Sequence, residues 1–201
     1  MPIVQHTSWE DIYQFGNLQS ASWFRSDVDP DIEKAVTTYG QKGGRVLDVG
    51  CGMGMQTIAL AKLGYPATGI DVSPTAIHHA RQLAEREGVE VTFTVANFLH
   101  ARFPEPFSII LDRAVLQGFS VHEHELYMEA LQHACSASGI VIVKTLHQQS
   151  QKSVGPHGYD EEALKALFAP AFSLENIWEC SFSGHPNAPK NALCAILRRE
   201  A

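Results

Sequence analysis

The segment from Arg45 to Gly54 limits what this chain can fold into more than any other. It reads RVLDVGCGMG, an apolar, β-branched run that ends in Asp48 and continues into glycines at alternate positions, Gly50, Gly52 and Gly54. Glycine tolerates positive φ and lets a ligand approach the backbone without meeting a Cβ atom. A strand that leads through such a loop into a helix is typical of a nucleoside-cofactor site.

A second acid and the glycine spacing narrow the cofactor class. Asp71 follows about 20 residues after the glycines, where an acid can accept hydrogen bonds from two ribose hydroxyls. The dinucleotide fingerprint G-x-G-x-x-G needs a third glycine for close helix packing, but Met55 stands at that position. Over residues 46–54 the chain instead resembles the first motif of the class I S-adenosylmethionine (SAM) methyltransferases. A nicotinamide cofactor and a glycine turn that serves packing alone are the alternatives.

The order of helix and strand signals predicts an α/β fold. Asp29-Pro30 and Ser73-Pro74 each place proline after an N-cap residue, which predicts helices to about Tyr39 and Glu87. Further helices are expected near residues 55–63, 121–135 and 160–168, and strands at 89–95, 107–111, 139–145, 172–182 and 192–197. Alternating strands and helices predict a parallel sheet. The resemblance implies a Rossmann-like three-layer sandwich whose seven-stranded, mostly parallel sheet ends in an antiparallel C-terminal hairpin.

Length and composition favour one methyltransferase domain over residues 1–201, with an N-terminal arm or lid at 1–28 and a SAM-binding core at 29–201. The 201 residues are 45% hydrophobic, enough to bury a full core. A net charge of -7 argues against nucleic acid. The apolar runs are too short to span a membrane, and the four cysteines are scattered, as is usual in a reducing compartment. We expect a cytoplasmic monomer or weak homodimer.

The resemblance implies roles for residues around the glycine loop. Asp48 matches the acid near the methionyl amino group, and Asp71 matches the acid that binds the ribose. Asn97 stands where relatives carry an acid for the adenine amino group, and its carbonyl can still accept a hydrogen bond. Trp9, Tyr13, Trp23 and Phe24 are expected to form an aromatic lid or to pack the arm on the core. The residues expected to contact SAM are Trp23, Asp48, Gly50, Cys51, Gly52, Gly54, Asp71, Val72, Asn97, Phe98 and Asp112.

The methyl acceptor is expected beside Asp112 and Arg113, because ligands of open α/β sheets bind beyond the carboxyl ends of the strands. The segment around these residues resembles the small-molecule thiopurine and thiol S-methyltransferases, as does the loop at residues 155–159. Asp112, His147 and His157 are candidate bases for ionising a nucleophile, and Arg113 either holds an anionic substrate group or pairs with Asp112. No metal is expected, because His122 and His124 are two positions apart and do not share a helix face.

These features predict an enzyme that transfers the methyl group of SAM to a small-molecule nucleophile and releases S-adenosylhomocysteine (SAH). Methyl transfer is an in-line displacement that mainly requires alignment and exclusion of water. A thiol is the expected acceptor, and oxygen or nitrogen acceptors are the alternatives. A SAM- or SAH-binding protein without turnover is the alternative from another functional class.

Overall fold

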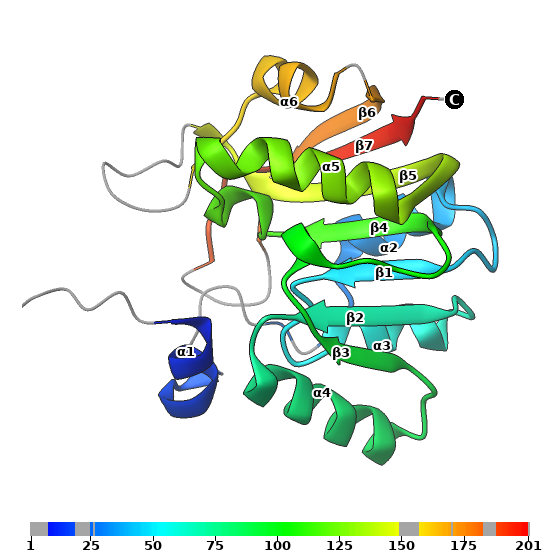
Figure 1. Ribbon diagram of the computed structural model, residues 1–201, viewed down its shortest axis with the longest axis vertical. Helices are drawn as coiled ribbons and strands as arrows, with labels where there is room; N and C mark the ends of the chain where they lie inside the picture. The colour runs from blue at the N-terminus through cyan, green and yellow to red at the C-terminus, as the bar shows by residue number, and fades with distance from the viewer. Residues whose placement is uncertain are drawn as a thin grey trace, which may run out of the picture.

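A seven-stranded sheet of order β3-β2-β1-β4-β5-β7-β6 forms the middle layer of the protein (Figure 1). The computed structural model describes residues 8–18, 25, 27–148, 157–169, 171–182 and 188–200. The strands are β1 (Val46–Val49), β2 (Ala67–Asp71), β3 (Thr92–Val95), β4 (Phe107–Arg113), β5 (Cys135–Leu146), β6 (Phe172–Cys180) and β7 (Ala192–Arg199). Strands β1 to β5 pair in parallel, and β7 runs antiparallel to both β5 and β6. The predicted sheet, with its C-terminal hairpin, is confirmed.

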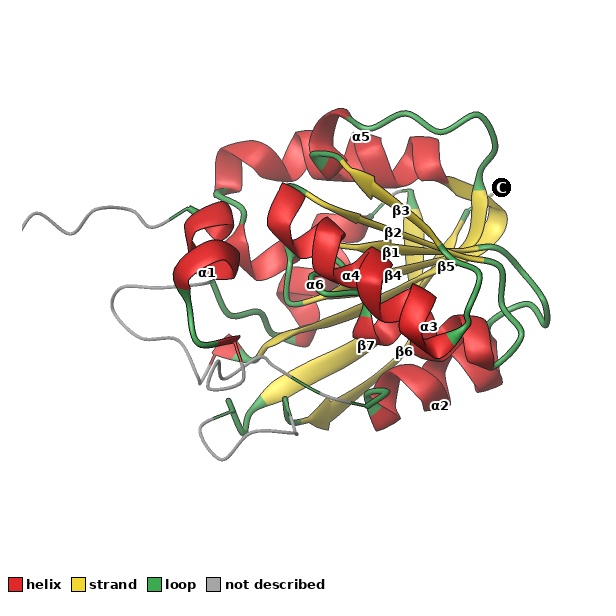
Figure 2. Ribbon diagram, turned by 90° about the horizontal axis from the view of Figure 1, so that it is seen from below, coloured by secondary structure: helices red, strands yellow, loops and turns green. Residues whose placement is uncertain are grey.

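Helices cover both faces of this sheet, as Figure 2 shows for α5 and α2. Helices α2 (Pro30–Tyr39), α3 (Met55–Lys62) and α4 (Pro74–Glu87) pack on one face, and α5 (His124–Ala134) and α6 (Glu161–Phe168) on the other. Strand residues alternate between the two cores, because successive side chains point to opposite faces of a sheet. Ile110 therefore lies in the core under α5, and Ile109 and Leu111 lie in the core under α2.

Local capping signals set the helix ends. The Asp29 side chain accepts a hydrogen bond from the Asp31 amide at the start of α2, and Ser73 accepts one from the Ala76 amide at the start of α4. Proline occupies the first helical position of both helices. Gly88 ends α4 with a φ of 63°. Both helices have the predicted boundaries.

The N-terminal arm contains a helix that the sequence patterns did not predict. Helix α1 (Trp9–Phe15) begins with a capping box, in which the Ser8 side chain and the Asp11 amide, and the Asp11 side chain and the Ser8 amide, are hydrogen-bonded. It lies at the carboxyl edge of the sheet beside the start of α4 (Figure 1). Helix α1 is therefore part of the edge where the glycine loop lies.

The largest differences from the predicted boundaries are at the starts of three other elements. Strand β5 begins at Cys135, earlier than residue 139, and β3 begins at Thr92, later than residue 89. The helix expected from residue 121 divides into a 3-10 turn, η4 (Val121–Glu123), and α5. In the described part of the chain, no helix has the length and apolar character needed to cross a membrane.

Candidate active site

The glycine loop between β1 and α3 has a left-handed backbone at Gly50, Gly52 and Gly54, with φ values of 62°, 54° and 79°. For other residues this left-handed conformation costs free energy, and their Cβ atoms would also clash with neighbouring side chains. A Cβ atom at Gly50 would lie 2.4 Å from Val115 Cγ2, and one at Gly52 would lie 2.6 Å from the Tyr13 hydroxyl. The third glycine has a packing role, because a Cβ atom there would lie 2.6 Å from Phe93 Cζ. Gly50 and Gly52 thus form a narrow cradle under α1 and the loop after β4.

Asp48 lies at the end of β1, with its side chain on the face covered by α2 and α3. It is buried, and Thr57 of α3 donates a hydrogen bond of 2.6 Å to its carboxyl. Burial raises the pKa of Asp48 to about 7, against the lowering effect of the Thr57 hydrogen bond and of the Arg113 charge. A positively charged amino group beside this carboxyl would favour its ionised form.

Asp71, at the end of β2, ties the glycine loop to the start of α4. Its two oxygens accept hydrogen bonds of 2.9 Å from the Gly52 and Ser73 amides. Burial raises its pKa, and these amides oppose that rise. A carboxylate has about four acceptor positions, so these two bonds leave capacity for ribose hydroxyls.

Helix α1 covers the space between the two acids. The buried Tyr13 ring reaches the glycine loop, and burial followed by the charges of Asp71, Cys51 and Asp48 raises the pKa of its hydroxyl. Glu10 fixes the helix in this place, because its carboxylate accepts hydrogen bonds of 2.5 Å from the hydroxyls of Ser73 and Thr75. Of the lid aromatics, Tyr13 therefore reaches the loop. Trp23 and Phe24 lie outside the described residues.

The side expected to bind adenine is formed by the ends of β2 and β3. Val72 and Val95 are 48% and 44% exposed, a large fraction for apolar residues at strand ends. The Asn97 carbonyl accepts a hydrogen bond from the Leu99 amide, which leaves one acceptor position on this oxygen and the NH2 group as a donor for a ligand. Phe98 needs a correction, because it is buried in the core with its ring centroid 5.8 Å from that of Tyr127.

Asp112, expected to be catalytic and to contact SAM, has a structural environment instead. Its carboxylate is fully buried and accepts hydrogen bonds from the Tyr127 hydroxyl at 2.8 Å and from the amides of Val115 and Leu116. Burial raises its pKa to about 6. These protein donors use the acceptor positions that a substrate would need, so Asp112 orders the turn η3 (Leu116–Gly118) after β4.

Arg113 does not pair with Asp112, because the two side chains leave β4 on opposite faces. Its Nε atom lies 2.9 Å from Asp29 Oδ2, and the buried Lys144 of β5 binds the other oxygen of Asp29 at 2.6 Å. Asp29 and Lys144 were not among the predicted site residues. The signal that could have revealed them is a lysine in the otherwise apolar run of β5.

Histidines and a tyrosine gather where β4 and β5 end. The Tyr159 hydroxyl and His124 Nε2 share a hydrogen bond of 3.0 Å. His157 donates its amide to the Gln117 carbonyl and lies close enough for its charge to lower the pKa of His124, an effect second to burial. His147 forms a β-bridge with Tyr159 and lines a cavity of about 80 Å³ with Glu179, Cys180 and Lys190. Sequence reasoning had missed His124 as a site residue.

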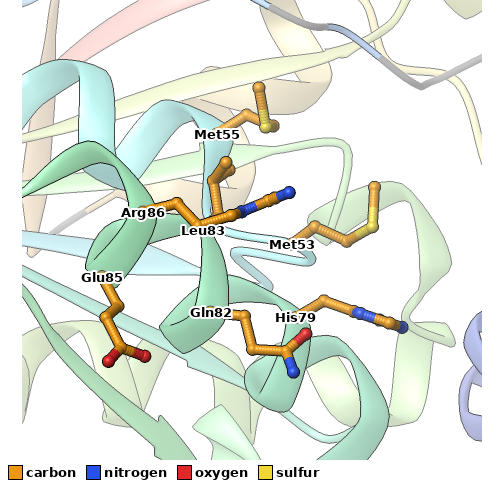
Figure 3. Close-up of a pocket in the computed structure, with 7 residues that line it drawn as sticks. All are labelled: Met53, Met55, His79, Gln82, Leu83, Glu85 and Arg86. Carbon is orange, nitrogen blue, oxygen red and sulfur yellow. The ribbon is translucent and has the colours of Figure 1, made fainter.

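A larger cavity of about 580 Å³ lies beside the glycine loop, between that loop and α4 (Figure 3). Met53, Met55 and Leu83 form its apolar part, and four polar side chains of α4 complete the lining: His79, Gln82, Glu85 and Arg86. Asp48 and Asp71 do not line it. Across the described residues, no three His, Cys, Asp or Glu side chains are grouped as metal ligands.

Comparisons with known proteins find similar sequences and similar folds. Residues 40–180 match the family model described as "Methyltransferase domain". The chain is 30% identical over 159 residues to the 2-heptyl-1-hydroxyquinolin-4(1H)-one methyltransferase of Mycobacteroides abscessus, covering 77% of this chain and 70% of that enzyme. It is 33% identical over 108 residues to a ubiquinone biosynthesis O-methyltransferase of Xylella fastidiosa, a match that covers 53% of this chain and 43% of that enzyme. A SAM-dependent methyltransferase structure from Methanosarcina mazei shares the fold, with a TM-score of 0.74 and 18% identity. The match covers 87% of this chain and 99% of that one.

Proposed function

This chain belongs to the methyltransferase domain family and uses SAM as its methyl donor, and from this premise we propose that it methylates an ionisable hydroxyl group of a small molecule. SAM supplies an electrophilic methyl group on a sulfonium centre. Methylation therefore requires the protein to align the acceptor, exclude water and accept the proton that the acceptor loses.

The cofactor site has the donors and acceptors that SAM needs at each end. Asp48, once ionised, accepts from the methionyl amino group, and Asp71 accepts from the ribose hydroxyls. Val72 and Val95 provide an apolar surface for adenine, which the Asn97 NH2 group complements. Because Gly50 and Gly52 lack side chains, Val115 and the Tyr13 hydroxyl can lie against the backbone of the loop between the two acids. Cys51 belongs to this loop through its backbone.

The observation that carries the acceptor class is the hydrogen bond between His124 and Tyr159 at the ends of β4 and β5. The pKa of His124 is lowered, so its imidazole is neutral at physiological pH and can take a proton. Burial raises the pKa of Tyr159 to about 12, so its phenol stays protonated. For His124 to act as a base, the Tyr159 oxygen must accept from Nε2–H, so that Nδ1 keeps the lone pair that takes the proton. We assign His124 as the base, with His157 and His147 as neighbouring polar groups of the acceptor site.

Two of the relatives support a hydroxyl acceptor. One is named for a 1-hydroxyquinolone and the other for O-methylation in ubiquinone biosynthesis. A thiol is the second candidate, favoured by the likeness of residues 111–113 to thiol methyltransferases and by easier ionisation, since a thiol has a pKa of about 8.5 and a phenol one of about 10.

Transfer of a radiolabelled methyl group from SAM to hydroxyquinolones, phenols, thiols, amines and lysine peptides tests the proposal. We expect turnover with hydroxyl compounds. Transfer confined to amines or lysine peptides would refute the acceptor class. His124→Gln should lower kcat about a hundredfold with little change in the KM for SAM. His122→Gln is the matched control, because His122 is exposed and lies two positions earlier, in η4.

A further inference from the structure

A row of charged side chains crosses the sheet at its carboxyl edge, on the face covered by α2 and α3. Asp48 pairs with Leu111 in the register of β1 and β4, and Arg113 lies two positions further along β4. Arg113 in turn pairs directly with Lys144 of β5. Side chains two positions apart on a strand share a face, so Asp48, Arg113 and Lys144 follow one another across three neighbouring strands.

Two carboxylates hold the two cations of this row. Asp29, fully buried at the N-cap of α2, binds Lys144 Nζ with one oxygen and Arg113 Nε with the other. Asp31 adds a second contact to Lys144 at 2.7 Å. Phe182 covers the pair, with its ring centroid 5.2 Å from the Arg113 guanidinium and 5.7 Å from Lys144 Nζ. Burying Asp29, Arg113 and Lys144 is costly, and pairing between opposite charges, to which the partly exposed Asp31 contributes, offsets that cost.

Neighbouring residues of α3 connect this cluster to Asp48. Gln56 accepts the Asp29 amide at 2.7 Å and donates to the Asp27 carbonyl at 3.0 Å. The next residue, Thr57, donates to Asp48. The carboxyl of Asp48 and the guanidinium of Arg113 are thus fixed relative to one another by a single turn of helix.

We propose that Arg113 binds the carboxylate of the methionyl moiety of SAM, and that Asp29 and Lys144 are positioning residues that fix its guanidinium. The proposal rests on the assignment of Asp48 to the methionyl amino group. An amino acid carries its ammonium and carboxylate on one carbon, so an acid and a cation side by side complement both groups. Arginine suits this role, because its planar fork matches a carboxylate and it stays charged.

Arg25 is the competing cation. It is also buried, but it pairs with Asp27 at 2.9 Å and donates to the Val28 carbonyl at 3.1 Å, within the arm that leads into α2. It lies on no strand of the sheet. The shared face and the strand register therefore favour Arg113 as the partner of a ligand group beside Asp48.

Calorimetry with two ligands tests the proposal without a methyl acceptor. The ligands are SAH and decarboxylated SAH, which lacks only the carboxylate, and the readout is the ratio of their dissociation constants at pH 8. Arg113→Gln should weaken SAH binding about tenfold or more and leave the analogue unaffected, so the ratio approaches one. Asp29→Asn should also lower the ratio. Asparagine caps a helix as well as aspartate, so α2 keeps its N-cap while the charge on the two cations is lost.

Control variants separate positioning from general damage. Arg45→Gln removes a surface cation paired with Glu105 and should leave the ratio unchanged. Lys144→Met keeps the length of the side chain and should lower the ratio; if it fails to fold, Asp29→Asn still decides the question. A wild-type ratio in Arg113→Gln, or a loss confined to Arg25→Gln, would overturn the proposal. Failure of the wild type to bind either ligand would overturn the cofactor site with it.

Discussion

The Thr57 hydroxyl donates a hydrogen bond of 2.6 Å to the Asp48 carboxyl, which is otherwise withdrawn from solvent. Burial raises the pKa of Asp48 to about 7. Near neutral pH about half of the ligand-free molecules therefore hold a proton at this site. Because the methionyl ammonium of SAM requires the ionised carboxylate, ligand binding and proton release are coupled.

SAH binding should weaken as the pH falls through 7. With one proton to displace from a group of pKa about 7, the dissociation constant should rise about tenfold between pH 8 and pH 6. Calorimetry at several pH values measures this, and the same titrations in Asp48→Asn should give weak binding with a flat profile. A wild-type affinity that is equal at pH 6 and pH 8 would contradict the role given to Asp48.

Asp48→Asn should stabilise the ligand-free protein at alkaline pH. The folded-state pKa of about 7 exceeds the ordinary value of 3.8, so Asp48 favours folding fully below pH 3.8 and loses this contribution as the pH rises through 7. The neutral amide avoids the loss, which corresponds to about 4 kcal/mol at pH 8. Urea unfolding should show a larger gain in the free energy of unfolding of the variant over wild type at pH 8 than at pH 5. An equal difference between the two proteins at both pH values would refute the linkage.

Glu10→Gln should speed the release of SAH, because it weakens the hold of α1 on the start of α4. The Glu10 carboxylate accepts from the hydroxyls of Ser73 and Thr75, and these bonds lower its pKa. We expect the dissociation rate of radiolabelled SAH to rise about two- to fivefold. Gln14→Ala, at an exposed position of the same helix, should leave the rate unchanged. Equal rates in Glu10→Gln and wild type would show that α1 does not retain the ligand.

Tyr127→Phe tests the structural role of Asp112. The variant removes the 2.8 Å hydrogen bond to the buried carboxylate, so the free energy of unfolding should fall by about 1–3 kcal/mol. The pKa of Asp112 should also rise above its value of about 6, because a donor to the charged form is lost. SAH affinity should be retained. Unchanged stability together with lost methyl transfer would instead favour the catalytic role expected from the sequence.

Local signals were sufficient to predict the fold and the methyl donor. Each of Asp29-Pro30 and Ser73-Pro74 carries its own capping chemistry, so the boundaries of α2 and α4 needed no tertiary information. The glycine spacing, with Met55 at the decisive position, favoured SAM over a nicotinamide cofactor, and family membership confirms a SAM-dependent enzyme over a non-catalytic binding protein. The likeness to thiopurine and thiol S-methyltransferases stays a prediction.

The environments of the other candidate site residues could not be predicted from the sequence, because they depend on burial and on long-range pairing. Asp112 and Phe98 have the right places in the chain, but only the packing around Tyr127 shows that both side chains face the core. Asp29 and Lys144 are 115 positions apart, so no local pattern joins them. The role proposed for His124 depends on Tyr159 and His157, which the fold brings next to it.

The most direct test of the account is calorimetric titration of SAH into the wild-type protein and Asp71→Ala at pH 8. Asp71 binds the Gly52 and Ser73 amides and is assigned to the ribose, so its loss removes both a ligand contact and a support of the glycine loop. We predict one SAH molecule per wild-type chain with micromolar-range affinity, and loss of measurable binding in the variant. Equal affinity in the two proteins would contradict the site described between Asp48 and Asp71.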